Sequence, residues 1–285
     1  MQNRLLENNS GPTGKNRMIS IFVMYAMVGG VAGILAGLLG IGGGLVIVPM
    51  LVYCFTRQGV SDQTIMHLAL GTSMASIMFT AVSSFWSHHR RGAVRWRVVR
   101  RIVAGILVGT FLGTIVAAGL STRFLKGFFV VFLYYTAIRM LSGRNPGPGR
   151  PLPGPAGMFG MGNVIGAVSS LVGIGGGTLS VPFMVSCNIP LREAIGTSAA
   201  IGFPIALAGT VGYVFNGLSV ATLPDYSLGY VYLPALAGII SASVVTAPIG
   251  VRLAHSLPVD MLKRVFAGFL IIMATRMLIR LIQGS

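Results

Sequence analysis

The residues of this chain best suited to bind a solute form a glycine-rich motif that occurs twice. The motif reads GIGGG at 40–44 and again at 173–177, and a Val-Pro dipeptide follows each copy after three further residues. Glycine adopts backbone conformations that other residues resist, so successive N–H groups can turn toward one point and bind an anion. We predict solute contacts at six of these glycines: Gly42, Gly43, Gly44, Gly175, Gly176 and Gly177.

The segment after each motif supports this interpretation. Segments 45–55 and 178–187 are apolar but about half as long as a membrane-spanning helix, so each predicts a half-helix that begins at the glycines. The N-terminus of such a helix offers free N–H groups and a partial positive charge. The alternative is that the glycines only permit close helix packing. Two copies with the same Val-Pro dipeptide favour the solute site.

A Gly-Thr-Ser sequence follows each glycine motif. Thr72 and Ser73 belong to the first copy, and Thr197 and Ser198 belong to the second. Their hydroxyls can donate hydrogen bonds to an oxyanion without bringing a fixed charge into the membrane. They can equally bond to a neighbouring helix or to carbonyls of their own helix. The sequence leaves both roles open.

An ionisable side chain stands four residues before each Gly-Thr-Ser sequence. It is His67 in the first copy and Arg192 in the second. An ionisable group inside a membrane is a functional candidate by default, whereas one at a helix end can extend to the interface. We therefore include both among the predicted solute-binding residues.

The composition of the chain indicates that membrane-spanning helices must position these residues. Only 9% of the 285 residues are charged and 54% are hydrophobic. A soluble domain carries about 25% charged residues, so the chain is predicted to be an all-α polytopic membrane protein. Eight long apolar segments and the two half-helices give eight to ten membrane segments, at 18–39, 45–55, 64–86, 102–120, 125–141, 159–172, 178–187, 195–215, 230–250 and 261–282.

The chain divides into two similar halves. Nine of the fifteen positions in 40–54 are identical 133 residues later, and further matches cover most of the chain. We predict two homologous repeats, each a glycine-broken helix and half-helix followed by three spanning helices. The expected organisation is a disordered N-terminal tail, a first repeat, a Pro/Gly linker and a second repeat, at 1–17, 18–142, 143–156 and 157–285.

Charge in the loops favours an inverted arrangement of the repeats. Loop 87–101 carries six arginines, whereas the corresponding loop 217–229 carries no Lys or Arg and contains Asp225. The positive-inside rule places these loops on opposite sides of the membrane. That requires five crossings in each half, with the broken segment counted as two. Four crossings in each half would give parallel repeats, and cations near the N-terminus favour that alternative.

Several function classes are excluded by what the sequence lacks. It contains no Ser-His-Asp set, no cluster of metal-ligating residues and no GxxxxGK[ST] motif, so we expect no enzyme activity, no metal and no cofactor. The net charge of +16 lies mostly between apolar segments, as in loops that face the cytoplasm, so we expect no nucleic-acid partner. Cys54 and Cys187 are expected to be buried thiols.

The doubled GxGGGxxxVP pattern and the HxAxGTS sequence with its weaker AxGTS copy resemble the TauE/SafE family of sulfite and organosulfonate exporters over roughly residues 20–282. The resemblance implies a multi-pass protein of a bacterial inner membrane that moves small sulfur-containing anions such as sulfite and sulfoacetate. It also implies that the site lies at the two glycine motifs, His67 and the two Gly-Thr-Ser sequences.

We therefore expect a secondary exporter that works by alternating access around a midplane site, with a small anion and the lipid bilayer as its partners. A proton-coupled importer, a channel-like anion pore and a non-transporting scaffold or sensor are the alternatives. Proton coupling would require Glu193, Asp62 or His67, since the chain has only five acids. Assembly as a homodimer is left open.

Overall fold

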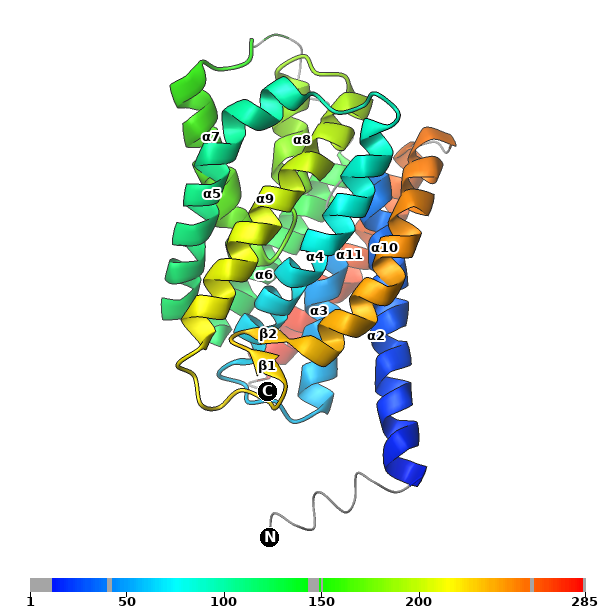
Figure 1. Ribbon diagram of the computed structural model, residues 1–285, viewed down its shortest axis with the longest axis vertical. Helices are drawn as coiled ribbons and strands as arrows, with labels where there is room; N and C mark the ends of the chain where they lie inside the picture. The colour runs from blue at the N-terminus through cyan, green and yellow to red at the C-terminus, as the bar shows by residue number, and fades with distance from the viewer. Residues whose placement is uncertain (1–11, 40–42, 143–148, 150, 257–258, 284–285) are drawn as a thin grey trace.

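The computed structural model describes residues 12–39, 43–142, 149, 151–256 and 259–283, and within them the chain is almost entirely helical (Figure 1). The helices of the first half are α2 Pro12–Leu39, α3 Gly44–Arg57, α4 Ile65–His89, α5 Trp96–Gly119 and α6 Thr122–Leu141. Those of the second half are α7 Pro155–Val172, α8 Gly177–Ser186, α9 Leu191–Gly217, α10 Leu233–Ser256 and α11 Val259–Ile282. A short hairpin, β1 Ser227–Leu228 and β2 Val231–Tyr232, precedes α10.

Eight of the helices in the described part of the chain are long and apolar enough to cross a membrane, whereas α3 and α8 are shorter. The prediction of an all-α polytopic membrane protein is confirmed. The helix α2 begins at Pro12, so residues 12–17 of the predicted tail are helical, while residues 1–11 lie outside the described part. Most of the predicted linker, 143–148 and 150, also lies outside it.

The two halves have the same order of helix lengths: one long helix, one short helix and three long helices. Corresponding helices run in opposite directions along the long axis, as α4 and α9 show (Figure 1). The loop between α4 and α5 lies at one end of the molecule, and the β1–β2 hairpin lies at the other (Figure 1).

The halves are interleaved rather than side by side. The helix α2 packs along α10, and α7 packs along α5, so the first helix of each half lies against the fourth helix of the other. Glycines allow the close approach: a Cβ on Gly33 would lie 2.5 Å from the carbonyl oxygen of Ser243, and one on Gly109 would lie 2.5 Å from the Cα of Asn163. Small residues at membrane helix interfaces let backbones approach in this way.

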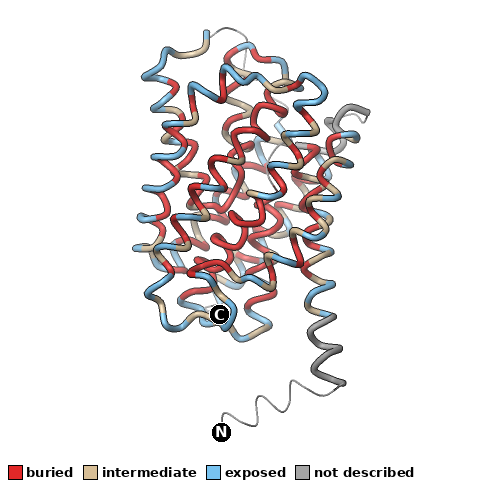
Figure 2. Tube along the Cα trace, in the orientation of Figure 1, coloured by how far each residue is buried: buried red, intermediate tan, exposed pale blue. Residues whose placement is uncertain are grey.

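The helices α4 and α9 pack against each other and are the most deeply buried of the spanning helices. Figure 2 shows buried residues along the middle of the molecule and exposed residues on its outer faces and at its ends. Large apolar side chains on the outer helices are exposed, for example Val131 at 68% and Val245 at 67%. Such faces suit contact with lipid.

Candidate functional site

Both half-helices begin at a glycine in the left-handed conformation. Gly43 has φ 78° and ψ −10° and caps α3, while Gly176 has φ 78° and ψ −13° and caps α8. A side chain with a Cβ is strained at such angles, which explains why glycine occupies both positions. Gly42 was also predicted to contact solute, and it lies outside the described residues.

The two breaks meet near the centre of the molecule. A Cβ on Gly44 would collide with the carbonyl oxygen of Gly173, so the start of α3 touches the chain just before α8. Ser73 of α4 donates a hydrogen bond of 2.8 Å to the same carbonyl. A Cβ on Gly202 of α9 would lie 3.0 Å from the carbonyl oxygen of Gly175. Gly44 and Ser73, both predicted from the first half, therefore contact the second glycine motif at Gly173.

The first Gly-Thr-Ser sequence holds the β1–β2 hairpin. The hydroxyl of Thr72 accepts a 2.9 Å hydrogen bond from the backbone N–H of Tyr232, and Gly71 packs against the carbonyl of Tyr230. Burial raises the pKa of both tyrosines. Thr72 thus joins α4 to the chain that enters α10.

The second Gly-Thr-Ser sequence holds the equivalent loop of the other half. Thr197 accepts a 2.9 Å hydrogen bond from the backbone N–H of Arg95, and Gly196 packs against the carbonyl of Ala93. Ser198 donates to the carbonyl of Ile195 at 2.9 Å. The structure thus shows these hydroxyls in the helix and loop bonding that the sequence left as one alternative, and solute contact stays a prediction.

His67 lies buried in the first turn of α4, on the side of the molecule that carries the hairpin. Its Nε2 lies 3.0 Å from the carbonyl oxygen of Ala117, and its ring stacks on Tyr230 with centroids 5.1 Å apart. A carbonyl only accepts, so Nε2 is the donor. The other nitrogen, Nδ1, is buried without a hydrogen-bond partner. Ser73, which bonds to the second break, lies six residues or about 1.7 turns further along α4.

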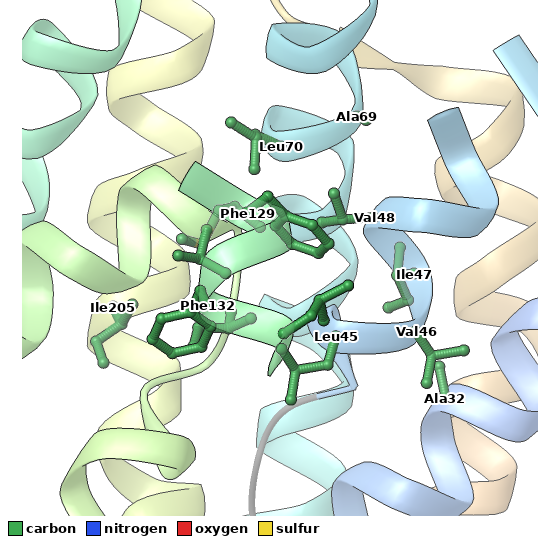
Figure 3. Packing of buried hydrophobic residues seen from close by; sticks show 14 of the residues in the cluster. Ala32, Leu45, Val46, Ile47, Val48, Ala69, Leu70, Phe129, Phe132 and Ile205 are labelled. Carbon is green, nitrogen blue, oxygen red and sulfur yellow. The ribbon is translucent and has the colours of Figure 1, made fainter. Parts of the chain in front are cut away.

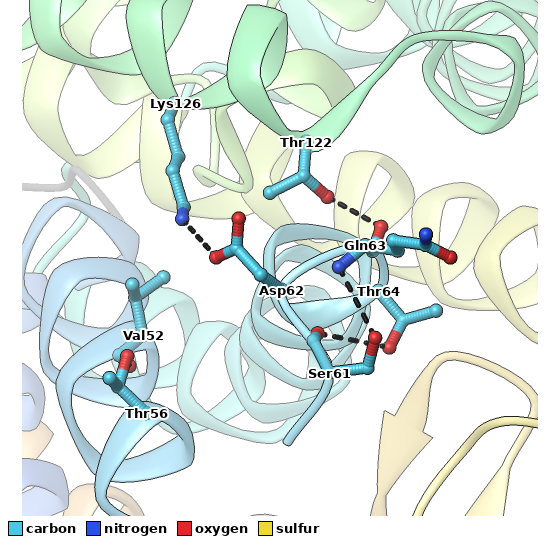
Figure 4. A network of polar contacts seen from close by, with 8 residues as sticks. All are labelled: Val52, Thr56, Ser61, Asp62, Gln63, Thr64, Thr122 and Lys126. Carbon is cyan, nitrogen blue, oxygen red and sulfur yellow. Dashed lines mark hydrogen bonds and ion pairs between the residues drawn. The ribbon is translucent and has the colours of Figure 1, made fainter. Parts of the chain in front are cut away.

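The two acids considered for proton coupling form ion pairs near helix ends. Asp62 bonds to Lys126 at 2.6 Å in the loop before α4 (Figure 4), and its side chain is 73% exposed. Glu193, in the first turn of α9, pairs with Arg95. Its neighbour Arg192 is exposed. These groups lie apart from the glycine breaks.

Three hydroxyls near the second break were not singled out from the sequence. Ser169, Thr178 and Ser180 each have a buried side-chain oxygen without a hydrogen-bond partner. Their positions 133 residues earlier hold Ala36, Leu45 and Ile47. That difference between otherwise similar segments is a signal that the sequence contained. No group of three His, Cys, Asp or Glu residues in the described part of the chain is placed to bind a metal.

The comparison with protein families covers both breaks and all the predicted site residues. The model described as Sulfite exporter TauE/SafE matches residues 25–277. The chain belongs to the TauE/SafE family. The resemblance noted from the glycine and Gly-Thr-Ser motifs is thereby confirmed, and a TauE/SafE protein is a membrane transporter rather than an enzyme.

Curated relatives of this TauE/SafE protein span most of its length. A probable membrane transporter protein from Haemophilus influenzae is 37% identical, over 92% of this chain and 100% of the relative. One from Methanocaldococcus jannaschii is 25% identical, over 90% of this chain and 95% of the relative. No solved structure matches the chain. With eight spanning helices and these relatives, the chain is a multi-pass protein of the cell membrane.

Proposed function

We propose that this TauE/SafE protein exports small sulfur-containing anions such as sulfite or sulfoacetate. The observation that carries the proposal is the pair of half-helices whose N-termini begin at Gly43 and Gly176 in the interior. Irregular backbone at membrane depth is tolerated where it is packed in protein or lines a pathway, and helix N-termini attract anions. The family description adds sulfite as the substrate class.

We further infer that the two halves are inverted repeats that alternate access to the site. Equal helix orders, opposite helix directions and the reciprocal pairing of α2 with α10 and α7 with α5 support this inference (Figure 1). Inverted repeats provide two equivalent ways to pack one half against the other. The site could then open to one side of the membrane and afterwards to the other by a change in how the halves pack, without refolding of either half.

The membrane potential is sufficient to drive such export. A monoanion leaving a cell that is negative inside gains about 2.3 kcal/mol per 100 mV. The acids Asp62 and Glu193 are already paired with Lys126 and Arg95, which supports a carrier without proton coupling. A proton-coupled importer or a pore remains the competing mechanism that an experiment must separate.

The test is flux from proteoliposomes loaded with sulfite or sulfoacetate under an imposed potential. Saturable, potential-dependent efflux is expected, and Gly176→Val should reduce it at least tenfold, because a side chain there would distort the cap of α8. Gly59→Val is the matched control: Gly59 has φ 74° but open space around it, so the same substitution strains the backbone in the same way but away from the breaks.

Other results would reassign the function. Non-saturating flux without counterflow would indicate a pore, and accumulation driven by a proton gradient would indicate an importer. Absence of flux with a wide panel of anions, in protein shown to be folded, would support a scaffold or sensor.

A further inference from the structure

The second glycine break carries hydroxyls that have no partner in the protein. Ser169 and Ser180 are 0% exposed, and the Oγ of each lacks a hydrogen-bond partner, as does the buried Oγ1 of Thr178. The Oγ of Ser169 lies 3.6 Å from the position that a Cβ on Gly176 would occupy, so it is directed at the cap of α8. Thr178 and Ser180 belong to the first turns of the same helix.

Six hydroxyls in the described part of the chain are buried without a partner, and three of them belong to the second break. The other three, on Ser84, Thr110 and Ser227, are scattered over α4, α5 and β1. Serine and threonine in an apolar helix commonly bond to a carbonyl of the preceding turn. Here Ser76 bonds to Thr72, Thr80 bonds to Ser76, and Thr136 bonds to Phe132 in that manner. A buried hydroxyl without a partner is costly, so three of them around one helix N-terminus call for a ligand.

The first break does not offer the same groups. The corresponding residues are Ala36, Leu45 and Ile47, all fully buried or nearly so. Figure 3 shows Leu45 among buried apolar side chains that include Phe129 and Phe132. The caps Gly43 and Gly176 therefore share a backbone conformation, but the side chains around the two breaks differ in their chemistry.

We propose that the two breaks are not equivalent and that the second one binds the oxyanion head group. The hydroxyls of Ser169, Thr178 and Ser180 and the N-terminal N–H groups of α8 would donate hydrogen bonds to its oxygens. The first break would provide an apolar wall. This proposal rests on the proposed function for the identity of the transported solute, since it specifies which half of the central site holds the anion.

The chemistry of the donors defines the ligand class. Three neutral hydroxyls and a helix N-terminus suit a head group with three oxygens, such as sulfite or a sulfonate. They carry no fixed charge, so the anion is held by hydrogen bonds alone and can be released again. Because Ser169 and Ser180 are fully buried, the anion reaches them only when the packing around α8 opens. Ile205 of α9, which lies against Gly176, is the side chain that must move.

Binding and transport are measured separately on the full-length protein. Thermal unfolding in detergent is followed with increasing sodium sulfite, sodium sulfoacetate or sodium sulfate, against sodium chloride at the same ionic strength. A ligand that binds only the folded state raises the melting temperature, and the rise grows with the logarithm of ligand concentration once that concentration exceeds the Kd. The variants are Ser169→Ala, Ser180→Ala and Thr178→Val. Each is checked first for an unchanged melting temperature in chloride.

Two matched controls distinguish ligand contacts from packing. Ser186→Ala makes the same substitution at the other end of α8, where the hydroxyl already bonds to the carbonyl of Phe183. Thr178→Ser removes the γ-methyl group but keeps the hydroxyl. We expect both controls to bind sulfite like the parent protein, whereas each of the three test variants should weaken binding about tenfold or more.

The outcomes separate this proposal from the proposed function. If sulfite stabilises the parent and the three test variants equally, or if no oxyanion stabilises the parent, the second-break site is overturned, even where flux is observed. If stabilisation is lost only in the test variants while the parent shows no flux, the site stands and the transport function fails.

Discussion

At the scale of single residues, hydrogen bonds join the two halves at the glycine and Gly-Thr-Ser motifs. Ser73 was predicted to contact solute, and its hydroxyl donates to Gly173 across a separation of 100 residues. Thr72 and Thr197 accept from the backbone of loops that lead into α10 and α5. The hydroxyls of the two Gly-Thr-Ser sequences thus hold together the helices and loops around the glycine breaks.

The bond from Ser73 should be measurable as stability. We expect Ser73→Ala to lower the free energy of unfolding in detergent by about 1 kcal/mol, because the buried carbonyl of Gly173 loses a donor. Ser87→Ala provides the control, since its hydroxyl bonds within its own helix to Ser83. Equal effects of the two substitutions in thermal unfolding would show that the contact between the halves adds nothing.

The paired acids allow a second prediction at this scale. Neutralising Asp62 or Glu193, as Asp62→Asn or Glu193→Gln, should change potential-driven efflux by less than about twofold. Both acids form partly or largely exposed ion pairs, which contribute little to stability. Flux of labelled sulfite under an imposed potential, with and without a proton gradient, makes the measurement. Loss of gradient-driven movement in either variant would instead assign that acid to proton coupling.

At the scale of helices, glycines decide which pairs pack. Gly33 of α2 faces Ser243 and Thr246 of α10, and Gly109 of α5 faces Asn163 of α7. Each pair joins helices of different halves. Because membrane helices gain little from the hydrophobic effect against each other, close backbone contact supplies much of the attraction between them.

Filling one of these contacts should separate the helices. We expect Gly33→Leu to destabilise the fold by about 3 kcal/mol, because its Cβ would collide with the side chain of Thr246 and also with the backbone of Ser243, which cannot move aside as a side chain can. Gly30→Leu, on the same helix but with open space around it, should be tolerated. Size-exclusion chromatography of the detergent-solubilised protein, with its melting temperature, gives the comparison. A well-folded Gly33→Leu variant would contradict the close packing.

At the scale of the whole molecule, the charges of the loops at its two ends predict its orientation across the membrane. Loop 87–101, which carries six arginines, contains the turn between α4 and α5, and the segment 217–229 lies at the opposite end with the hairpin (Figure 1). By the positive-inside rule we expect the arginine loop in the cytoplasm. We then expect the start of α2, the segment that contains Lys15 and Arg17, to lie outside.

Cysteine labelling checks this orientation. In a background with Cys54→Ala and Cys187→Ala, we expect a membrane-impermeant maleimide to label Ser219→Cys in intact cells and to leave Arg90→Cys unlabelled. Both positions are exposed, so accessibility differs only through the membrane. Permeabilised cells, in which both should react, are the control. The reverse pattern would show that the N-terminal cations, not the loop arginines, set the topology.

Much of this protein could be read from its sequence, because hydropathy and glycine spacing are local properties. Apolar segments of about 20 residues predicted the spanning helices, and GIGGG predicted the sites where two shorter helices begin. The helices before the two breaks, α2 and α7, are long enough to span the membrane. The half-helices α3 and α8 start where the glycines permit positive φ. The family, too, was evident from these motifs.

Contacts between distant residues were decided only by the tertiary structure. Nothing local in the sequence shows that Ser73 meets Gly173, that α2 packs on α10, or that Thr197 holds the loop at Arg95. Nor does the sequence show that Ser169 and Ser180 remain without partners, because a hydroxyl in a helix can always bond to its own backbone. Packing determines which of those bonds form, and packing depends on the whole chain.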